Sequence, residues 1–263
     1  MQGRLRIRME IALLALVVTA GTACDVMFQG MNAQASDTWK RSYTLGEGGQ
    51  VEVQNVNGMI EVTPSADATT VEVLAERRAR AGSEDAAREA LKNIKMIEQV
   101  NPKRIALGIE RTATTGSFGR TVEITFHLRV PRSAAVKVNT QNGEVRVVGV
   151  AGAVEAETTN GGIVGESLGG SVKADTTNGS VRIQVTAVQP DGIRLETTNG
   201  SVELQVPADT KANVSAHWAN GGFEATGLNP EGEHGRRSFE GKLNGGGPQI
   251  TLRTTNGRIR ISS

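Results

Sequence analysis

The chain has 263 residues and a nearly even charge, with 29 Lys and Arg residues against 28 Asp and Glu residues. This balance creates no strong field toward nucleic acid, and we expect no nucleic-acid partner. Aromatic residues make up only 3% of the chain, too few for a platform on which bases or sugars stack. With 32 Gly and 7 Pro residues, the composition is typical of an all-β protein with many tight turns.

The N-terminus is typical of an export signal. Three Arg residues within the first eight positions precede the apolar segment 11–18, and small residues then lead to Cys24, the only cysteine. A basic start, a short apolar core and a small-residue cleavage site define a secretory signal, and this apolar core is too short to span a bilayer. We therefore assign residues 1–23 to a signal peptide.

Cys24 resembles the lipid acceptor of bacterial lipoproteins, which becomes the first residue of the mature chain. The resemblance implies a membrane anchor through an N-terminal lipid at Cys24, on the periplasmic or surface side of the envelope. Residues 24–40 are then expected to be a tether. The alternative is ordinary cleavage, after Ala23 or at the segment 33–35, which would leave Cys24 without a role.

An Asn-Gly dipeptide recurs seven times with the same flanking pattern. Apolar residues stand six and four positions before each Asn and three and five positions after it, and Gly165 is the one exception. Each copy therefore predicts two short alternating strands with one buried and one polar face. We attribute the dipeptide to a left-handed backbone at the bend. The predicted turn residues are Asn57, Gly58, Asn142, Gly143, Asn160, Gly161, Asn178, Gly179, Asn199, Gly200, Asn220, Gly221, Asn256 and Gly257.

Two arrangements satisfy this pattern. In a hairpin hinged at Asn-Gly, Ala174 would pair with Ile183 of the same copy. In a solenoid, each copy would instead stack on the next at about 4.8 Å. The charge pattern allows both, but identical residues at identical positions favour in-register ladders of Thr and Asn between stacked copies.

The Thr-Thr-Asn-Gly-x-Val/Ile repeats, the opening copy 51–62, the Val130-Pro131 pair and the lipoprotein-like leader together resemble the bacterial putative-adhesin family. These are β-strand-repeat domains of unknown function, related to the head-GIN auto-transporter adhesins. The resemblance covers roughly residues 41–263 and implies a β-helical fold with an adhesion role and no catalytic motif. We therefore expect an all-β, parallel β-solenoid (β-helix) over residues 41–263.

Residues 65–131 lack the repeat and are expected to cap one end of the stack. Ser83 is a suitable N-cap for one short helix that ends near Asn93, and alternating strands flank this helix. The segment 112–120 is expected to be a loop between two of these strands. At the other end of the stack, charged residues of the last copy should blunt the exposed edge; they are Arg253, Arg258 and Arg260.

Catalytic and metal-binding motifs are weak. Ser167 lies in a Gly-x-Ser-x-Gly sequence, but a strand rather than a helix is expected to follow, so the sequence favours a solenoid corner over a nucleophile elbow. The three histidines, at 127, 217 and 234, do not have the spacing of zinc ligands. We expect no enzyme activity, no cofactor and no metal site.

Four residues are candidate surface contacts. Stacking would align Glu157, Asp175 and Glu196, and such carboxylates could bind a cation or raise one another's pKa, although a solvated polar face is the simpler interpretation. Trp218 replaces a Thr of the repeat, and two Phe residues are near it in sequence. It could contact a ligand or simply pack.

These observations predict a non-enzymatic cell-envelope protein whose solenoid is a structural, adhesion-like interaction surface. Its expected partners are the membrane, through the lipid, and an envelope protein or glycan. One alternative, implied by the family resemblance, is an envelope-stress regulator or sensor. The other is a carbohydrate-active β-helix enzyme, which would need acidic and basic residues clustered over a groove.

Overall fold

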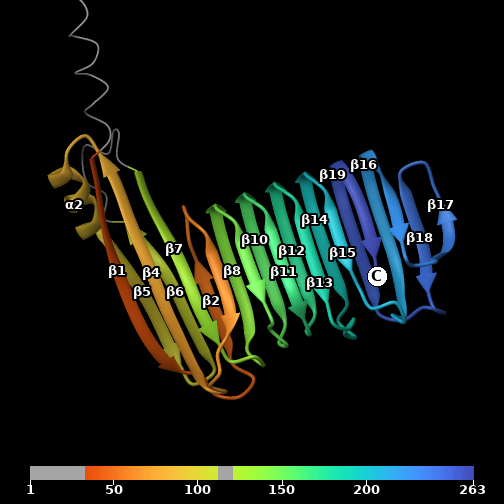
Figure 1. The fold of residues 1–263 in the computed structure, drawn as a ribbon, viewed down its shortest axis with the longest axis horizontal. Coiled ribbons are helices and arrows are strands. Elements are labelled where there is room, and N and C mark those ends of the chain that lie inside the picture. Colours follow the sequence, from red (N-terminus) through yellow and green to blue (C-terminus); the bar gives the residue numbers. More distant parts are fainter. Residues whose placement is uncertain (1–32, 112–120) are drawn as a thin grey trace, which may run out of the picture.

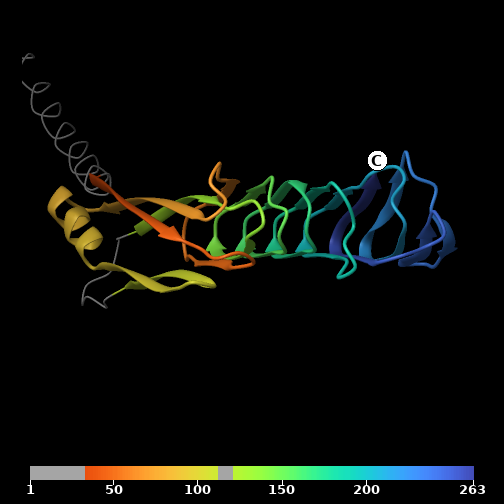
Figure 2. The same ribbon diagram turned by 90° about the horizontal axis from the view of Figure 1, so that it is seen from below.

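The computed structural model describes residues 33–111 and 121–263. The signal peptide, Cys24, the first part of the predicted tether and the predicted loop 112–120 lie outside these residues. Within them the chain forms a long stack of strands with one helix at an end (Figures 1 and 2).

Each Asn-Gly copy forms one rung, with a strand in each of two facing layers (Figure 2). The first layer holds β2 (Gln50–Gln54), β8 (Ala135–Asn142), β10 (Val154–Asn160), β12 (Val172–Asn178) and β14 (Ile193–Asn199). The second layer holds β3 (Ile60–Pro64), β9 (Val145–Val148), β11 (Ile163–Leu168), β13 (Val181–Val185) and β15 (Val202–Gln205). In the two remaining copies one long strand runs through both layers; these strands are β16 (Ala212–Thr226) and β19 (Gln249–Ser262).

Neighbouring rungs pair in parallel and in register. Ala174 of β12 lies opposite Ala156 of β10 on one side and Leu195 of β14 on the other, and not opposite Ile183. The solenoid prediction is therefore confirmed and the hairpin alternative is wrong. Parallel pairing brings identical repeat positions together, which gives each apolar column the same environment on every rung.

The four apolar columns form the core between the two layers. The apolar residues of these columns are buried on every rung except that of β16, where Phe223 and Ala225 are half-buried. At the exception, Gly165, a Cβ atom would lie 2.8 Å from the Leu168 Cδ1 atom. Leu168 thus fills the space that a larger residue would occupy, and a register shift between Gly165 and Leu168 allows this.

One end of the stack is covered by the non-repeat segment. Its elements are β4 (Thr70–Ala81), α2 (Glu84–Lys92), β5 (Ile94–Asn101), β6 (Arg104–Arg111) and β7 (Thr121–Val130). β6 and β7 extend the two layers in parallel, whereas β5 and β4 add antiparallel strands beyond them. The predicted helix is confirmed: the Ser83 Oγ atom accepts a hydrogen bond from the Ala86 N–H (3.2 Å), and the C-cap is Asn93.

The tether prediction is wrong for residues 33–40. They form most of β1 (Ala33–Thr44), which pairs along its whole length with β4 in antiparallel register. The sequence does not show the alternating pattern of a strand here, because β1 lies at the edge of its layer and few of its residues touch the core. Only Ala35, Trp39 and Tyr43 pack against the core, so the apolar alternation is sparse.

The prediction for the other end is also wrong. β19 lies between the rung of β14 and β15 on one side and β16 on the other (Figure 1). Arg253, Arg258 and Arg260 therefore belong to an interior rung and do not lie at the end of the stack. The interval between the last two copies contains β17 (Glu231–His234) and β18 (Ser238–Leu243). These two strands pair antiparallel beyond β16 and form the end of the stack.

Candidate interaction surface

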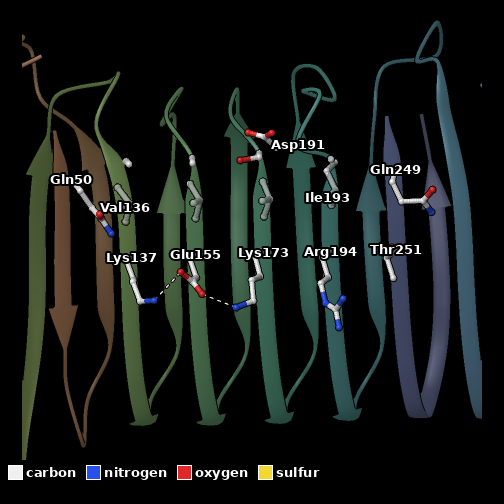
Figure 3. Close-up of a pocket in the computed structure, with 16 residues that line it drawn as sticks. Gln50, Val136, Lys137, Glu155, Lys173, Asp191, Ile193, Arg194, Gln249 and Thr251 are labelled. Carbon is white, nitrogen blue, oxygen red and sulfur yellow. Dashed lines mark hydrogen bonds and ion pairs between the residues drawn. The ribbon is translucent and has the colours of Figure 1, made fainter. Parts of the chain in front are cut away.

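The outer face of the first layer carries a shallow groove of about 560 Å³ (Figure 3). It crosses six rungs, from β2 to β19, and the alternation of the strands places polar side chains from each of these rungs along its floor. The labelled polar residues of the groove are Gln50, Lys137, Glu155, Lys173, Asp191, Arg194, Gln249 and Thr251. This surface therefore combines positive, negative and neutral hydrogen-bonding groups at a regular spacing.

A row of alternating charge lines the groove. The Glu155 carboxylate binds the Lys137 ammonium at 2.9 Å on one side and the Lys173 ammonium at 2.6 Å on the other (Figure 3). The hydrogen bonds from Lys173 and Lys137 hold the pKa of Glu155 below its usual range. Parallel in-register stacking creates this row, because lysine and glutamate alternate at one repeat position.

The predicted row of carboxylates lies beside it. Glu157, Asp175 and Glu196 occupy neighbouring positions on β10, β12 and β14, as stacking requires. Glu196 pairs with Arg253 at 3.2 Å and Arg194 at 2.7 Å. Arg194 on the same strand and Arg253 on the neighbouring rung thus neutralise the charge of Glu196.

Asp175 is the carboxylate of this row without an ion pair to any described residue. Burial, followed by the charges of Glu196 and Glu157, raises the pKa of Asp175 above its usual range. Across residues 33–111 and 121–263, no group of three or more His, Cys, Asp and Glu side chains is placed to hold a metal ion. The row therefore perturbs a carboxylate but does not form a metal-binding cluster.

The turn asparagines form a continuous ladder of hydrogen bonds. Except for Asn57, whose amide donates to the Val122 backbone carbonyl oxygen, each side-chain amide donates to the side-chain carbonyl oxygen of the neighbouring rung, for example Asn178 to Asn160 at 2.9 Å and Asn256 to Asn199 at 2.8 Å. The ladder follows spatial order rather than chain order, because Asn220 donates to Asn256 at 2.7 Å. The predicted left-handed backbone is wrong for these asparagines: among the described residues other than Gly, only Ser167 and Asn244 have a positive φ.

The turn glycines serve close stacking. A Cβ atom on Gly179 would lie 1.9 Å from the carbonyl oxygen of Gly161 on the neighbouring rung. That same oxygen accepts a hydrogen bond from the buried Thr176 hydroxyl at 2.9 Å. Of the seven turn glycines, Gly58 and Gly221 alone have a positive φ, so backbone conformation does not explain the other five. The dipeptide is thus required mainly by contact between rungs.

Trp218 lies in an aromatic cluster at the end of the stack. The Trp218 ring is 6.5 Å from the Phe223 ring, and Phe223 stacks on Phe239 at 4.6 Å between centroids. His234 of β17 joins the cluster at 4.7 Å from Phe239. The repeat pattern did not predict the place of His234 in this cluster, because β17 is outside the repeat. Phe239 is fully buried, whereas Trp218 is half-buried, so ligand contact by Trp218 stays a prediction.

The remaining candidates for catalysis or metal binding, Ser167 and two of the histidines, make local structural contacts. Ser167 has a φ of 53° and lies at the register shift of β11, and the next element is the strand β12. His127 is 2.8 Å from a Glu61 carboxylate oxygen, and His217 is 3.2 Å from one of Glu240. Each histidine therefore has a single carboxylate partner on the outer face.

Stacked rungs with buried aliphatic columns and polar outer rows define a parallel β-solenoid built from an Asn-Gly repeat. Residues 43–262 match the model of the Toastrack DUF4097 family, and the chain belongs to that family. This match confirms the family expected from the repeats, which is a family of domains of unknown function.

Solved structures also resemble this chain. A putative cell adhesion protein from Clostridium sporogenes is 11% identical, with 86% of this chain and 99% of that chain covered and a TM-score of 0.44. A putative adhesin from Bacteroides fragilis is 12% identical, with 86% and 96% covered and a TM-score of 0.38. Among curated proteins, none matches this chain. Over the described residues, no helix has the length and apolar character needed to cross a membrane.

Proposed function

We propose that this protein is a non-enzymatic component of the cell envelope that binds its partner through the outer face of the first layer. The single observation that carries the proposal is the row of Lys137, Glu155 and Lys173, whose charges are fixed relative to one another by ion pairs across three rungs. A rigid, preorganised surface loses little entropy on binding, so even modest polar contacts contribute to affinity.

The groove favours an extended partner. Its polar groups recur at the rung spacing of about 4.8 Å and alternate in charge from Lys137 to Lys173, which suits a chain with repeating donors and acceptors. A glycan strand or an extended segment of an envelope protein has this character. Lys173 and Arg194 lie half or more exposed at the side chain, so they remain accessible to such a partner.

We also propose that Cys24 is lipidated and anchors the domain. The alternative cleavage site at 33–35 would remove three residues of β1, and these residues pair with Ala79, Arg80 and Ala81 of β4. Cleavage before Cys24 leaves β1 whole. The nine residues from Cys24 to the start of β1 could then span at most about 30 Å between the membrane and the domain.

The binding proposal is tested by capture from envelope extracts. The double variant Lys137→Ala/Lys173→Ala removes both cations of the row, and we expect at least about a tenfold loss of affinity for the captured partner. The matched control is Arg146→Ala/Arg182→Ala, which removes two paired cations from the outer face of the second layer. Unchanged capture by the first variant, or an equal loss in both, would contradict the proposal.

The anchor is tested by metabolic labelling with a fatty-acid analogue. The wild-type chain should incorporate the label and sediment with membranes, and Cys24→Ala should do neither. A labelled Cys24→Ala chain, or an unlabelled wild type, would refute lipidation at this residue without affecting the binding proposal.

A further inference from the structure

The strand β5 has an open edge. In the part of the chain that the structure describes, β5 pairs only with β6, antiparallel and along all eight of its residues (Figure 1). Its other side therefore presents unpaired backbone N–H and C=O groups, which are a template for another strand.

This edge also carries the large apolar side chains that are exposed in residues 33–111 and 121–263. Ile97 is 36% exposed and Val100 is 50% exposed. Proteins normally protect an open edge with charged residues, Pro or a short strand. The edge strand of the opposite layer, β1, follows this rule, since its exposed residues are polar or charged. Of these two edges, that of β5 is the one that exposes large apolar side chains.

We propose that β5 pairs antiparallel with β5 of a second copy of this chain, with Ile97 opposite Ile97 of the second copy. The alternation of β5 is consistent with this geometry. Ile94 is buried and Glu98 contacts Tyr43 of β1 across the layers, so these two residues face inward, whereas Ile97 faces outward. A two-fold axis perpendicular to the layer keeps inward faces on the same side, so outward residues meet outward residues.

In this register both exposed side chains gain an apolar neighbour. Ile97 meets its own counterpart, and Val100 lies opposite Ile94 of the second copy. Such cross-strand apolar pairs are the unit of stabilisation in antiparallel sheets. The two copies therefore complement each other with no change in the fold.

The neighbouring registers are disfavoured. A shift in one direction places Glu98 opposite Glu98 of the second copy, and like charges directly opposite are destabilising. Glu98 cannot easily move away, because the Tyr43 hydroxyl donates a hydrogen bond to it at 2.6 Å. A shift in the other direction places Lys95 opposite Ile97 and Ile94 opposite Glu98, so these two isoleucines each lie beside a charge.

Cross-linking with cysteine tests both the partner and the register. Cells expressing the full chain as Ile97→Cys or Gln99→Cys are treated with a short, membrane-permeable thiol cross-linker before lysis. The wild type, whose one cysteine is Cys24, gives the background. We expect a product of twice the chain's mass for Ile97→Cys, and no increase over wild type for Gln99→Cys, which lies opposite Lys95 of the second copy.

Three results would overturn the proposal. They are the absence of a doubled product for Ile97→Cys, an equal yield for Gln99→Cys, and a product whose mass shows a different protein at this edge. Both substituted residues are exposed, so folding should be unaffected, and equal resistance of both variants to trypsin verifies this.

Discussion

A Cβ atom on Gly161 would lie 2.0 Å from the carbonyl oxygen of Gly143 on the neighbouring rung. The next residue, Gly162, has no such restriction, since its Cβ would lie 3.4 Å from the Ser180 carbonyl oxygen. Two adjacent glycines thus differ in what they contact, although neither has a positive φ. Contact between rungs therefore determines where glycine is required.

Gly161→Ala should destabilise the domain. The methyl group would force two backbones apart, and we expect the free energy of unfolding to fall by about 1–3 kcal/mol. Gly162→Ala is the matched control, with an expected change within about 0.5 kcal/mol. Denaturant titration of both variants measures the difference, and equal losses would show that rung contact is not the cause.

The asparagine ladder predicts a dependence on position. Asn178 both donates to Asn160 and accepts from Asn199, whereas Asn220, at the end of the ladder, only donates to Asn256 among the described residues. At about 0.5 kcal/mol for each exposed bond, Asn178→Ala should cost about 1 kcal/mol and Asn220→Ala about half of that. Urea unfolding tests this, and a larger loss for Asn220→Ala would contradict the ladder.

Two carboxylates of the outer face should respond oppositely to pH. The pKa of Asp175 is raised above 3.8, so its ionised form destabilises the fold at neutral pH, and this cost disappears as the pH falls below that value. Asp175→Asn should therefore raise the thermal midpoint at pH 7, with a gain that fades on acidification.

The pKa of Glu155 is lowered from 4.5, so its ionised form stabilises the fold above that pH, and the contribution is lost as the pH falls through the folded pKa. Glu155→Gln should lower the midpoint at pH 7 by about 2–4 °C, with a deficit that shrinks in acid. Thermal unfolding of both variants from pH 3 to 7 provides the comparison. Shifts of the same sign at pH 7 would contradict these assignments.

The aromatic cluster should stabilise the end of the stack through its buried member. Phe239 is fully buried and stacks on Phe223, so Phe239→Ala should cost about 3–5 kcal/mol. Trp218→Ala should cost less, because the Trp218 ring is only half-buried. Chemical denaturation measures both, and a Trp218→Ala variant that is the less stable of the two would assign the packing role to Trp218.

The local pattern predicted most of the solenoid. Inward columns such as Val172 and Ala174 follow from the two-residue period of a strand, and Ser83 marks the start of the helix because its side chain caps the first turn. The carboxylate row containing Asp175 was also predicted, since in-register stacking aligns equal repeat positions.

Features set by long-range geometry were not predicted. The strand β1 has few core contacts and so little apolar alternation. The position of β19 between β14 and β16 depends on the path of the chain through β17 and β18, which no local pattern encodes. The role of Gly161 follows from the carbonyl of another rung, and its neighbours in sequence give no sign of it.

The central claim is that the copies stack in parallel, in the spatial order that places β19 beside β14. Disulfide formation in three double-cysteine variants tests it most directly, with Glu196→Cys combined in turn with Arg253→Cys, His217→Cys and Glu203→Cys. We expect the 196/253 pair to form a disulfide, because these residues are opposite each other on β14 and β19. A disulfide in the 196/217 pair would instead indicate stacking in chain order, and one in the 196/203 pair would indicate a hairpin; either would contradict the fold described here.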